Sequence, residues 1–177
     1  MRYNSYNTTK PSIPNGYEMS REPRMQVKKI ENKEDYIDLL LEADPSKDMI
    51  HKYLNDSDVY ALKKGDELIS IAVILHIDRK TLELKNIVTT EKYRNKGYAK
   101  TLLKSLCGNY KQKYDRMLVG TTENNIPFYV KQGFDKYEKT IKNFFIDNYK
   151  EEVKDGDLVC TDLIYYSKDL KKKFKDN

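Results

Sequence analysis

Apolar residues recur along this chain with two spacings, and the spacing changes from segment to segment. Short apolar or alternating runs bounded by polar turns indicate strands. We predict strands at Met25–Ile30, Asp58–Lys63, Glu67–Ile77, Thr81–Thr90 and Arg116–Thr121, with two later strands around residues 134–145 and 158–167. The turn Lys64-Gly65-Asp66 joins the second of these strands to the third as a hairpin.

Other segments carry apolar residues at the spacing of a helix face. The clearest is Gly97–Lys113, where residues 98, 99, 102, 103, 106, 107 and 110 form one stripe. The remaining helical segments are a stretch that begins at Asn32 or Lys33 and stops before Pro45, the short segment Ser46–Leu54, and Asn125–Gln132. Gly133 comes directly after the last segment, and glycine commonly ends a helix.

The order of these elements predicts a mixed α/β domain over residues 25–167, with a mostly antiparallel sheet that is entered by hairpins and flanked by helices. Residues 1–24 contain three prolines and almost no aliphatic side chains, so they cannot bury enough apolar surface to offset their ordering entropy. We predict a flexible N-terminal arm there. Residues 168–177 are predicted to form a solvated basic tail.

The net charge of +5 over 177 residues first suggests a nucleic-acid partner. The distribution of the charge argues against one. The N-terminal arm has four basic and two acidic residues, the tail has five and two, and the segment between them is balanced. The fifteen tyrosines show no RNA-binding pattern either. We therefore expect no nucleic-acid partner.

Three further features narrow the functional class. The longest apolar run, Leu68–Ile77, is too short to cross a membrane, and no apolar signal segment comes after Met1. Cys107 and Cys160 do not make a disulfide framework, which favours a reduced, cytoplasmic setting. Two histidines cannot build a His-rich metal site, so we expect no metal.

The strongest chemical signal lies where a strand meets the long helix, in residues 83–106. Arg94-Asn95-Lys96-Gly97-Tyr98-Ala99 stands at the helix N-terminus, where unpaired N–H groups and the positive end of the helix dipole point outward. Such a site suits a phosphate or pyrophosphate. Neither the Walker sequence nor the three-glycine dinucleotide fingerprint fits this segment. Taken alone, the pattern is also that of a helix with a glycine near its start.

Together with the strand and short helix after it, this segment resembles the GNAT superfamily of acyl-CoA-dependent N-acetyltransferases. Members carry Arg/Gln-x-x-Gly-x-Gly/Ala after the fourth strand, then a long helix, a fifth strand and a short helix containing a tyrosine. This chain has Arg94-x-x-Gly97-x-Ala99, then Val119-Gly120-Thr121, then Phe128-Tyr129-x-x-x-Gly133-Phe134. The likeness covers roughly residues 25–167, and runs at 39–47 and 143–162 resemble a subgroup of small bacterial members. Ala99 replaces the commoner last glycine.

The resemblance implies a GNAT fold, in which a splayed sheet holds the co-substrate acetyl-CoA in a V-shaped cleft. It also implies transfer of the acetyl group to a primary amine of a small molecule or peptide, by direct attack in a ternary complex. The implied acetyl-CoA contacts are the backbone of Ile87, Val88 and Thr89, the amides of Asn95, Lys96, Gly97, Tyr98 and Ala99, the side chain of Arg94, and Asn124 or Asn125. Asn125 could equally be a plain N-cap.

The chemistry needs an acceptor for the amine proton and a donor for the departing thiolate. Tyr129 is the candidate donor, and a contact of the co-substrate, because a phenol with a pKa of about 10 is close to a thiol in acidity. Glu83 is the candidate base, acting through water. Alternation along the strand predicts one face with Leu82, Leu84, Asn86 and Val88 and another with Glu83, Lys85 and Ile87. The structural alternatives are a core aromatic for Tyr129 and a surface ion pair for Glu83.

Three other reactive side chains favour structural roles. Cys107 lies on the apolar stripe of the long helix, which favours packing over an acyl-cysteine route. His51 and His76 fall in a short helix and at a strand end, and we expect both to be structural or at the surface.

The acceptor is left open by the sequence: a small amine, an amino acid, an aminoglycoside-like compound or a peptide N-terminus. Its pocket would be shaped by residues 41–54 and by the strands after Gly133. The acids available for a cationic amine are Asp44, Asp48, Glu123 and Asp162. A second hypothesis is a GNAT-fold module that binds or senses acyl-CoA without turnover. Relatives contact one another through a C-terminal strand, so a homodimer is one option for assembly.

Overall fold

The computed structural model describes residues 23–172, so most of the predicted N-terminal arm and the last five residues of the predicted tail lie outside the described residues. The strands are β1 (Met25–Ile30), β2 (Ser57–Lys64), β3 (Glu67–His76), β4 (Thr81–Thr89), β5 (Arg116–Thr121), β6 (Lys136–Ile141), β7 (Lys154–Asp155), β8 (Leu158–Val159) and β9 (Leu163–Asp169). The helices are α1 (Ile37–Leu40), α2 (Lys47–Leu54), α3 (Tyr98–Tyr110), α4 (Ile126–Lys131) and α5 (Phe144–Asn148), with short 3-10 turns at Lys33–Tyr36, Glu91–Tyr93 and Glu123–Asn125.

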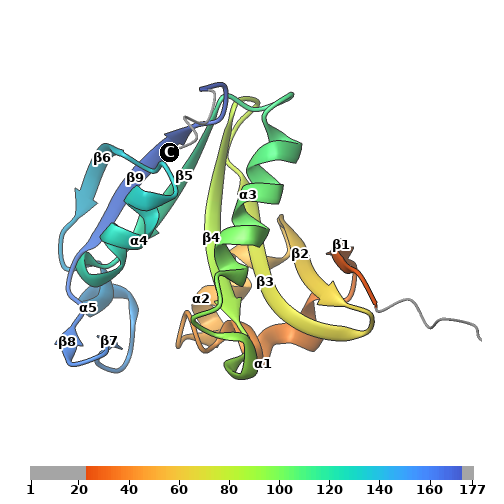
Figure 1. Cartoon of the computed structure of the whole chain (residues 1–177). Coiled ribbons are helices and arrows are strands. Elements are labelled where there is room, and N and C mark those ends of the chain that lie inside the picture. Colours follow the sequence, from red (N-terminus) through yellow and green to blue (C-terminus); the bar gives the residue numbers. More distant parts are fainter. Residues whose placement is uncertain (1–22, 173–177) are drawn as a thin grey trace, which may run out of the picture.

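Seven strands form one sheet in the order β1-β2-β3-β4-β5-β9-β6. Only β4 and β5 run parallel among the paired strands of residues 23–172. Their pairing extends from Thr81 opposite Arg116 to Leu84 opposite Val119 and then stops. Beyond that point the two strands diverge into an inverted V (Figure 1). The predicted mixed α/β class, with a splayed and mostly antiparallel sheet flanked by helices, is confirmed.

Helices cover both faces of this sheet, and each buries the apolar stripe that its sequence carries. On one face α3 packs Leu102, Leu103 and Leu106 against the strands. On the other face α2 packs Ile50 and Leu54, together with α1. An amphipathic helix gains most of its stability from this burial, which explains why the long predicted helix is present almost as expected. Within residues 23–172 no helix is long and apolar enough to cross a membrane.

A β-bulge in β4 corrects the predicted alternation of side chains. Ile74 of β3 pairs with Leu84, and the preceding Val73 pairs with Asn86, so Lys85 is an extra residue in the ladder. One inserted residue reverses the faces of every later residue in the strand. Leu82 and Leu84 therefore share the α3 face with Ile87, whereas Asn86, Val88 and Glu83 lie on the face covered by α1 and α2.

The end of the domain also differs from the expectation. Where one long strand was predicted around residues 134–145, β6 ends at Ile141 and a separate helix, α5, comes next. The chain turns out of the sheet because Asn143 adopts a positive φ of 54° and its N–H donates to Asp162 Oδ1 at 2.9 Å. The predicted boundary at residue 167 falls inside β9, since that strand runs to Asp169 and the next residue, Leu170, is buried in the core.

Strand β9 lies between β5 and β6, and both of its edges are paired. Within this chain, β9 therefore has no free edge along residues 164–167 for a partner's strand. Among the described strands of the sheet, the outer edges belong to β1 and β6.

Candidate active site

The separation of β4 from β5 opens a cleft of about 500 Å³. Residues from both faces of the sheet line it: Ala99, Phe128 and Tyr129 come from the α3 and α4 side, and Asp44 and Tyr53 come from the α1–α2 side. A passage that joins the two faces of a sheet can bring two substrates together from opposite sides. The cleft is therefore the part of the fold where a transfer reaction fits.

The turn before α3 presents a row of backbone donors. Asn95 and Gly97 have positive φ angles of 59° and 81°, and Gly97 is the N-cap residue of the helix. The first hydrogen bond that enters the helix is donated by Thr101 N to Gly97 O, and among the described groups the N–H groups of residues 95–100 donate none. A Cβ added to Gly97 would meet nothing within 4 Å, so this side of the turn is open. These features fit an anionic group at the helix N-terminus.

The charged side chains of this turn are engaged within the protein. Arg94 Nε donates to Thr89 O at 3.1 Å, and its guanidinium forms an ion pair with Glu42 in the loop after α1. Lys96 Nζ donates to Lys92 O at 3.0 Å and lies over the Tyr93 ring. Arg94 therefore connects the turn to the far wall of the cleft.

The edge of β4 that faces the cleft has no strand partner after Leu84. Thr90 N donates to Ile69 O in β3, and backbone groups alternate in direction along a strand, so those of Thr89 and Ile87 point toward the cleft. Val88 O accepts a hydrogen bond from Ser70 Oγ at 2.8 Å, and its side chain is buried against α1 and α2. The main chain of Ile87 and the N–H of Thr89 are thus available to an extended ligand, whereas Thr89 O already accepts from Arg94 Nε.

Tyr129 lies on α4 and lines the cleft. Gly133, at a φ of 87°, ends this helix as predicted, with Gly133 N donating to Val130 O and Phe134 N donating to Tyr129 O. This is a Schellman C-cap, in which the residue after the glycine packs back onto the last turn. Phe134 is fully buried, and its ring meets that of Tyr129 at 5.8 Å. The Phe-Tyr-x-x-x-Gly-Phe pattern is thus a device that fixes the position of the tyrosine.

The Tyr129 hydroxyl has no hydrogen-bond partner among the described residues. Burial raises the pKa of this phenol to about 12. It therefore stays protonated near neutral pH and is available as a hydrogen-bond donor.

The two asparagines before α4 hold a neighbouring hairpin. Asn124 Nδ2 donates to Asp155 O at 2.9 Å, and Asn125 Nδ2 donates to Asp155 Oδ2 at 2.7 Å. Asn125 lines the cleft, whereas Asn124 does not. Asn125 has the N-cap position of α4, but its side chain makes no capping hydrogen bond.

Glu83 lines the cleft from the opposite face of the sheet and is only 7% exposed. Its Oε1 accepts hydrogen bonds from Lys85 Nζ at 2.9 Å and from Tyr165 Oη at 3.1 Å. Its other oxygen has no hydrogen bond to a described residue. A carboxylate is therefore held at the point where β4 and β5 part.

Comparison with known proteins gives one consistent assignment. The model of the acetyltransferase (GNAT) family matches residues 21–134. An uncharacterized N-acetyltransferase, YvbK of Bacillus subtilis (strain 168), is 32% identical over 144 residues, which are 79% of this chain and 92% of that protein. The chain belongs to the GNAT family. The predicted enzyme class, an acyl-CoA-dependent acetyltransferase, is thereby confirmed.

Solved GNAT structures superpose on most of the chain. An acetyltransferase from Elizabethkingia anophelis with acetyl-CoA bound is 34% identical, with a TM-score of 0.75 over 82% of this chain and 97% of that one. A Bacillus subtilis acetyltransferase in complex with CoA is 29% identical, with a TM-score of 0.71 over 82% of this chain and 99% of that one. GNAT enzymes act on amines of small molecules or peptides.

On the α1–α2 side of the cleft of this GNAT protein, which we call the acceptor side for the proposal below, one carboxylate lies at the centre of a hydrogen-bond network. Asp44 accepts from Tyr53 Oη at 3.3 Å, from Tyr149 Oη at 3.0 Å and from Ser46 N at 3.3 Å. Burial raises the pKa of the Asp44 carboxyl, although these hydrogen bonds oppose the rise. Asn86 Nδ2 donates to Tyr53 Oη at 3.3 Å and to Leu40 O at 3.1 Å.

Of the four acids that the sequence offers for a cationic amine, Asp44 alone lines the cleft. Asp48 forms an exposed ion pair with Lys150, and Asp162 pairs with Lys142. Tyr53, Asn86 and Tyr149 were missed, because tyrosines are frequent in this chain and no local spacing singles out these two. The bulge at Lys85 is what moves Asn86 onto this wall.

The other reactive side chains have structural roles. Cys107 is buried on α3, and burial raises the pKa of its thiol to about 11, which disfavours a nucleophilic thiolate. His76 lies between Tyr114 Oη at 2.7 Å and Asp58 Oδ2 at 2.9 Å, and His51 faces Glu34 at 3.3 Å. Within residues 23–172 no group of His, Cys, Asp and Glu is arranged to hold a metal.

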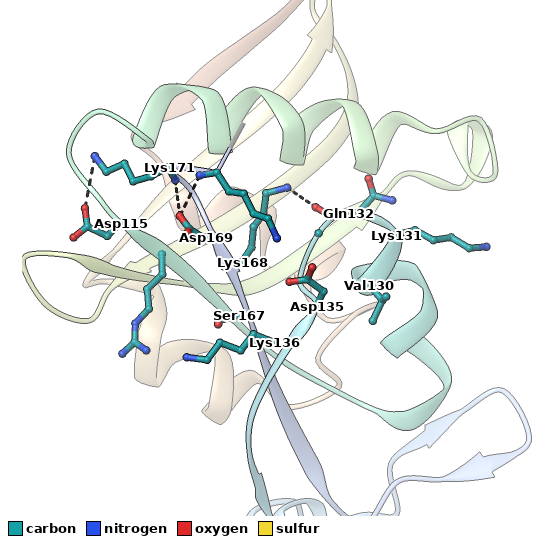
Figure 2. A pocket seen from close by; sticks show the side chains of 13 residues that line it. Asp115, Val130, Lys131, Gln132, Asp135, Lys136, Ser167, Lys168, Asp169 and Lys171 are labelled. Atoms are coloured by element: carbon teal, nitrogen blue, oxygen red, sulfur yellow. Dashed lines mark hydrogen bonds and ion pairs between the residues drawn. The ribbon is translucent and has the colours of Figure 1, made fainter. Parts of the chain in front are cut away.

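A larger hollow of about 1160 Å³ lies away from the cleft, between the end of α4, the start of β6 and the end of β9 (Figure 2). Its charged groups engage one another and the backbone: Lys171 Nζ lies 3.6 Å from Asp115, and the buried Lys168 donates to Gln132 O. No residue of β4 or α3 lines it, so it reaches neither the point where β4 and β5 part nor the free amides. The hollow therefore lacks the features that single out the cleft as the candidate site.

Proposed function

We propose that this GNAT protein transfers an acetyl group from acetyl-CoA to a primary amine of a small molecule or peptide, by direct attack in a ternary complex. One observation carries the proposal: the cleft joins the open N-terminus of α3 and the free edge of β4 on one face of the sheet to a carboxylate-lined wall on the other. Such a passage lets a thioester and an amine bind at the same time, each from its own side of the sheet.

The groups on the α3 side fit the parts of acetyl-CoA. The amides of Asn95, Lys96, Gly97, Tyr98 and Ala99 would hold the pyrophosphate, with Arg94 at its edge. The main chain of Ile87 and the N–H of Thr89 would pair with the pantetheine arm as an added strand, and Val88 would support that edge from the core. Asn125 is placed to contact the same arm, whereas Asn124 would act by holding the hairpin at Asp155.

In the proposed reaction the amine nitrogen forms a bond to the thioester carbonyl carbon and the carbon–sulfur bond breaks. Glu83 would take the amine proton through a water molecule, which fits its buried and partly unpaired carboxylate. Tyr129 would donate a hydrogen bond to the departing sulfur. Because the pKa of this phenol is about 12, well above that of a thiol, stabilisation of the thiolate is favoured over full proton transfer.

Acetyl-CoA binding by calorimetry, combined with free-thiol release against a panel of amines, tests this proposal. Binding with amine-dependent thiol release supports a transferase. Binding without thiol release from any amine would instead support the sensor module, and absence of binding would contradict both. A cytoplasmic location is also proposed, since Cys107 and Cys160 are both buried and unpaired. A homodimer stays a proposal, and size-exclusion chromatography with light scattering tests it.

A further inference from the structure

The cleft is lined by more acidic than basic side chains: Glu42, Asp44, Glu83 and Asp155 against Lys85 and Lys154. Both lining lysines are already paired, Lys85 with Glu83 and Lys154 with Glu152. Glu42 is paired with Arg94, which lies outside the lining. The carboxylate of Asp44 accepts hydrogen bonds from two phenol hydroxyls and one backbone N–H and forms no ion pair with a described residue, although the charge of Lys85 lowers its pKa. A ligand carboxylate would therefore meet anionic groups and no unpaired lining lysine. An ammonium group would instead meet the carboxylate of Asp44, which has no ion-pair partner among the described residues.

A second feature indicates that a ligand supplies a hydrogen-bond donor at this wall. Asn86 is 5% exposed and lines the cleft, and its Oδ1 is buried without a hydrogen-bond partner among the described residues. Its Nδ2 is committed to Leu40 O and Tyr53 Oη, so the orientation of the amide is set. Buried acceptors are rarely left without a donor. Asn86 and Asp44 bond to the same Tyr53 hydroxyl, each at 3.3 Å, so both side chains belong to one wall of the cleft.

The remaining wall is apolar and aromatic. Phe144 and Phe145 of α5 pack against the Tyr149 ring at centroid distances of 6.2 and 5.4 Å, and Met49, Val153 and Leu163 complete the lining. Aromatic walls of this kind suit an apolar body and also favour a nearby cation. The whole cleft has the volume of a small-molecule site.

From these observations we propose that the acceptor is a small primary amine with an apolar or aromatic body and no carboxylate, and that Asp44 and Asn86 bind its ammonium group before the proton is removed. This inference rests on the proposed acetyl transfer and narrows the acceptors to one chemical class. It disfavours free amino acids and polar amino sugars.

Matched pairs of amines test the inference directly. 2-Phenylethylamine is compared with phenylalanine, and tyramine with tyrosine, by thiol release with acetyl-CoA and by calorimetric binding to the CoA-saturated protein. We expect the amine without a carboxylate to be favoured by about 100-fold or more in both readouts, because the carboxylated partner buries an unpaired charge. Equal use of the two members of each pair would overturn the inference.

Asp44→Asn gives a second, independent test. We expect kcat/KM and the affinity for 2-phenylethylamine to fall by about 10- to 100-fold, since a hydrogen bond to a charged group is lost, while the affinity for acetyl-CoA is unchanged and reports an intact fold. Asp48→Asn, in the neighbouring α2 and outside the cleft, is the matched control and should behave as the wild type. An Asp44→Asn variant with wild-type amine affinity would overturn the inference.

The two proposals fail in distinguishable ways. Turnover of carboxylated and uncarboxylated amines alike would overturn only the acceptor class. Binding of acetyl-CoA with neither turnover nor binding of any amine would overturn the transferase proposal and the acceptor class together.

Discussion

Tyr149 donates a hydrogen bond from its Oη to Asp44 Oδ1 at 3.0 Å, across 105 residues of sequence. Asp44 precedes α2 on one arm of the splayed sheet, and Tyr149 comes after α5 beyond the other arm. Lys150 and Asp48 of the same two segments form an ion pair at 3.3 Å, but their side chains are 90% and 74% exposed, so this pair adds little to the tie. The arms of the V are therefore tied together on the acceptor side, where the carboxylate of Asp44 is held in a fixed orientation.

Replacing Tyr149 by Phe removes this tie and leaves the aromatic ring in place. We expect the KM for the amine to rise about five-fold, which corresponds to about 1 kcal/mol for one hydrogen bond. The KM for acetyl-CoA should not change, because that ligand is proposed to bind on the other face of the sheet. Steady-state kinetics with each substrate varied in turn measures the two KM values. A change in the KM for acetyl-CoA alone would contradict the role given to Tyr149.

Replacing Tyr129 by Phe removes the only polar atom of a side chain that Phe134 keeps in place. We expect kcat to fall by about 100-fold, because one positioned proton donor typically contributes a factor of this size. The Kd for acetyl-CoA should stay within about two-fold of the wild-type value. The control is Tyr137→Phe on β6, which is 56% exposed and should keep full activity. Wild-type turnover in Tyr129→Phe would remove this hydroxyl from the mechanism.

Glu83→Gln keeps the shape of the side chain and removes its basicity. We expect kcat to fall by at least about 100-fold, the lower end of the range for general base catalysis, with little change in acetyl-CoA affinity. Pre-steady-state measurement of thiol release separates this chemical step from product release. Unchanged turnover would mean that bulk water takes the amine proton.

Gly97 and Gly108 provide a matched pair of glycine substitutions. Gly97 has a φ of 81°, so an alanine there is strained by about 1 to 2 kcal/mol even though its Cβ would meet nothing. Distortion of this turn should weaken acetyl-CoA binding by about ten-fold. Gly108 is within α3, has no positive φ and also has open space around it, so Gly108→Ala should stabilise the fold by about 0.5 to 1 kcal/mol and leave binding unchanged. Calorimetry and thermal unfolding measure both effects, and equal binding by the two variants would contradict an anion cradle at Gly97.

Asp58 links β2 to β1, β3 and α3 outside the cleft. Burial opposes its ionisation, but hydrogen bonds from Lys29, His76 and Tyr110 outweigh that cost and hold the pKa of the carboxyl at about 2. A pKa below the unfolded value stabilises the fold above pH 4, and this contribution is lost as the pH falls toward 2. We expect Asp58→Asn to cost about 2 kcal/mol at pH 6 and clearly less at pH 3. Urea unfolding at the two pH values measures the difference, and a cost independent of pH would show that the carboxylate charge is not its source.

The sequence by itself determined the family and most of the elements. The Arg94-x-x-Gly97-x-Ala99 turn and the Tyr129 to Phe134 run are local patterns, because a left-handed glycine, a helix N-terminus and a Schellman cap are each built from a few neighbouring residues. For the same reason the long amphipathic helix and the hairpin strands are predictable from their spacing.

Only the tertiary structure decided which residues form the acceptor side of the cleft. The bulge at Lys85 exchanges the faces of β4, and nothing in the residue pattern of that strand marks where the extra residue is inserted. The turn at Asn143 depends on Asp162, and the network around Asp44 joins residues from α2, β4 and the end of α5. These contacts are between residues far apart in the chain, so their partners are set by how the sheet splays and packs, and not by spacing along the sequence.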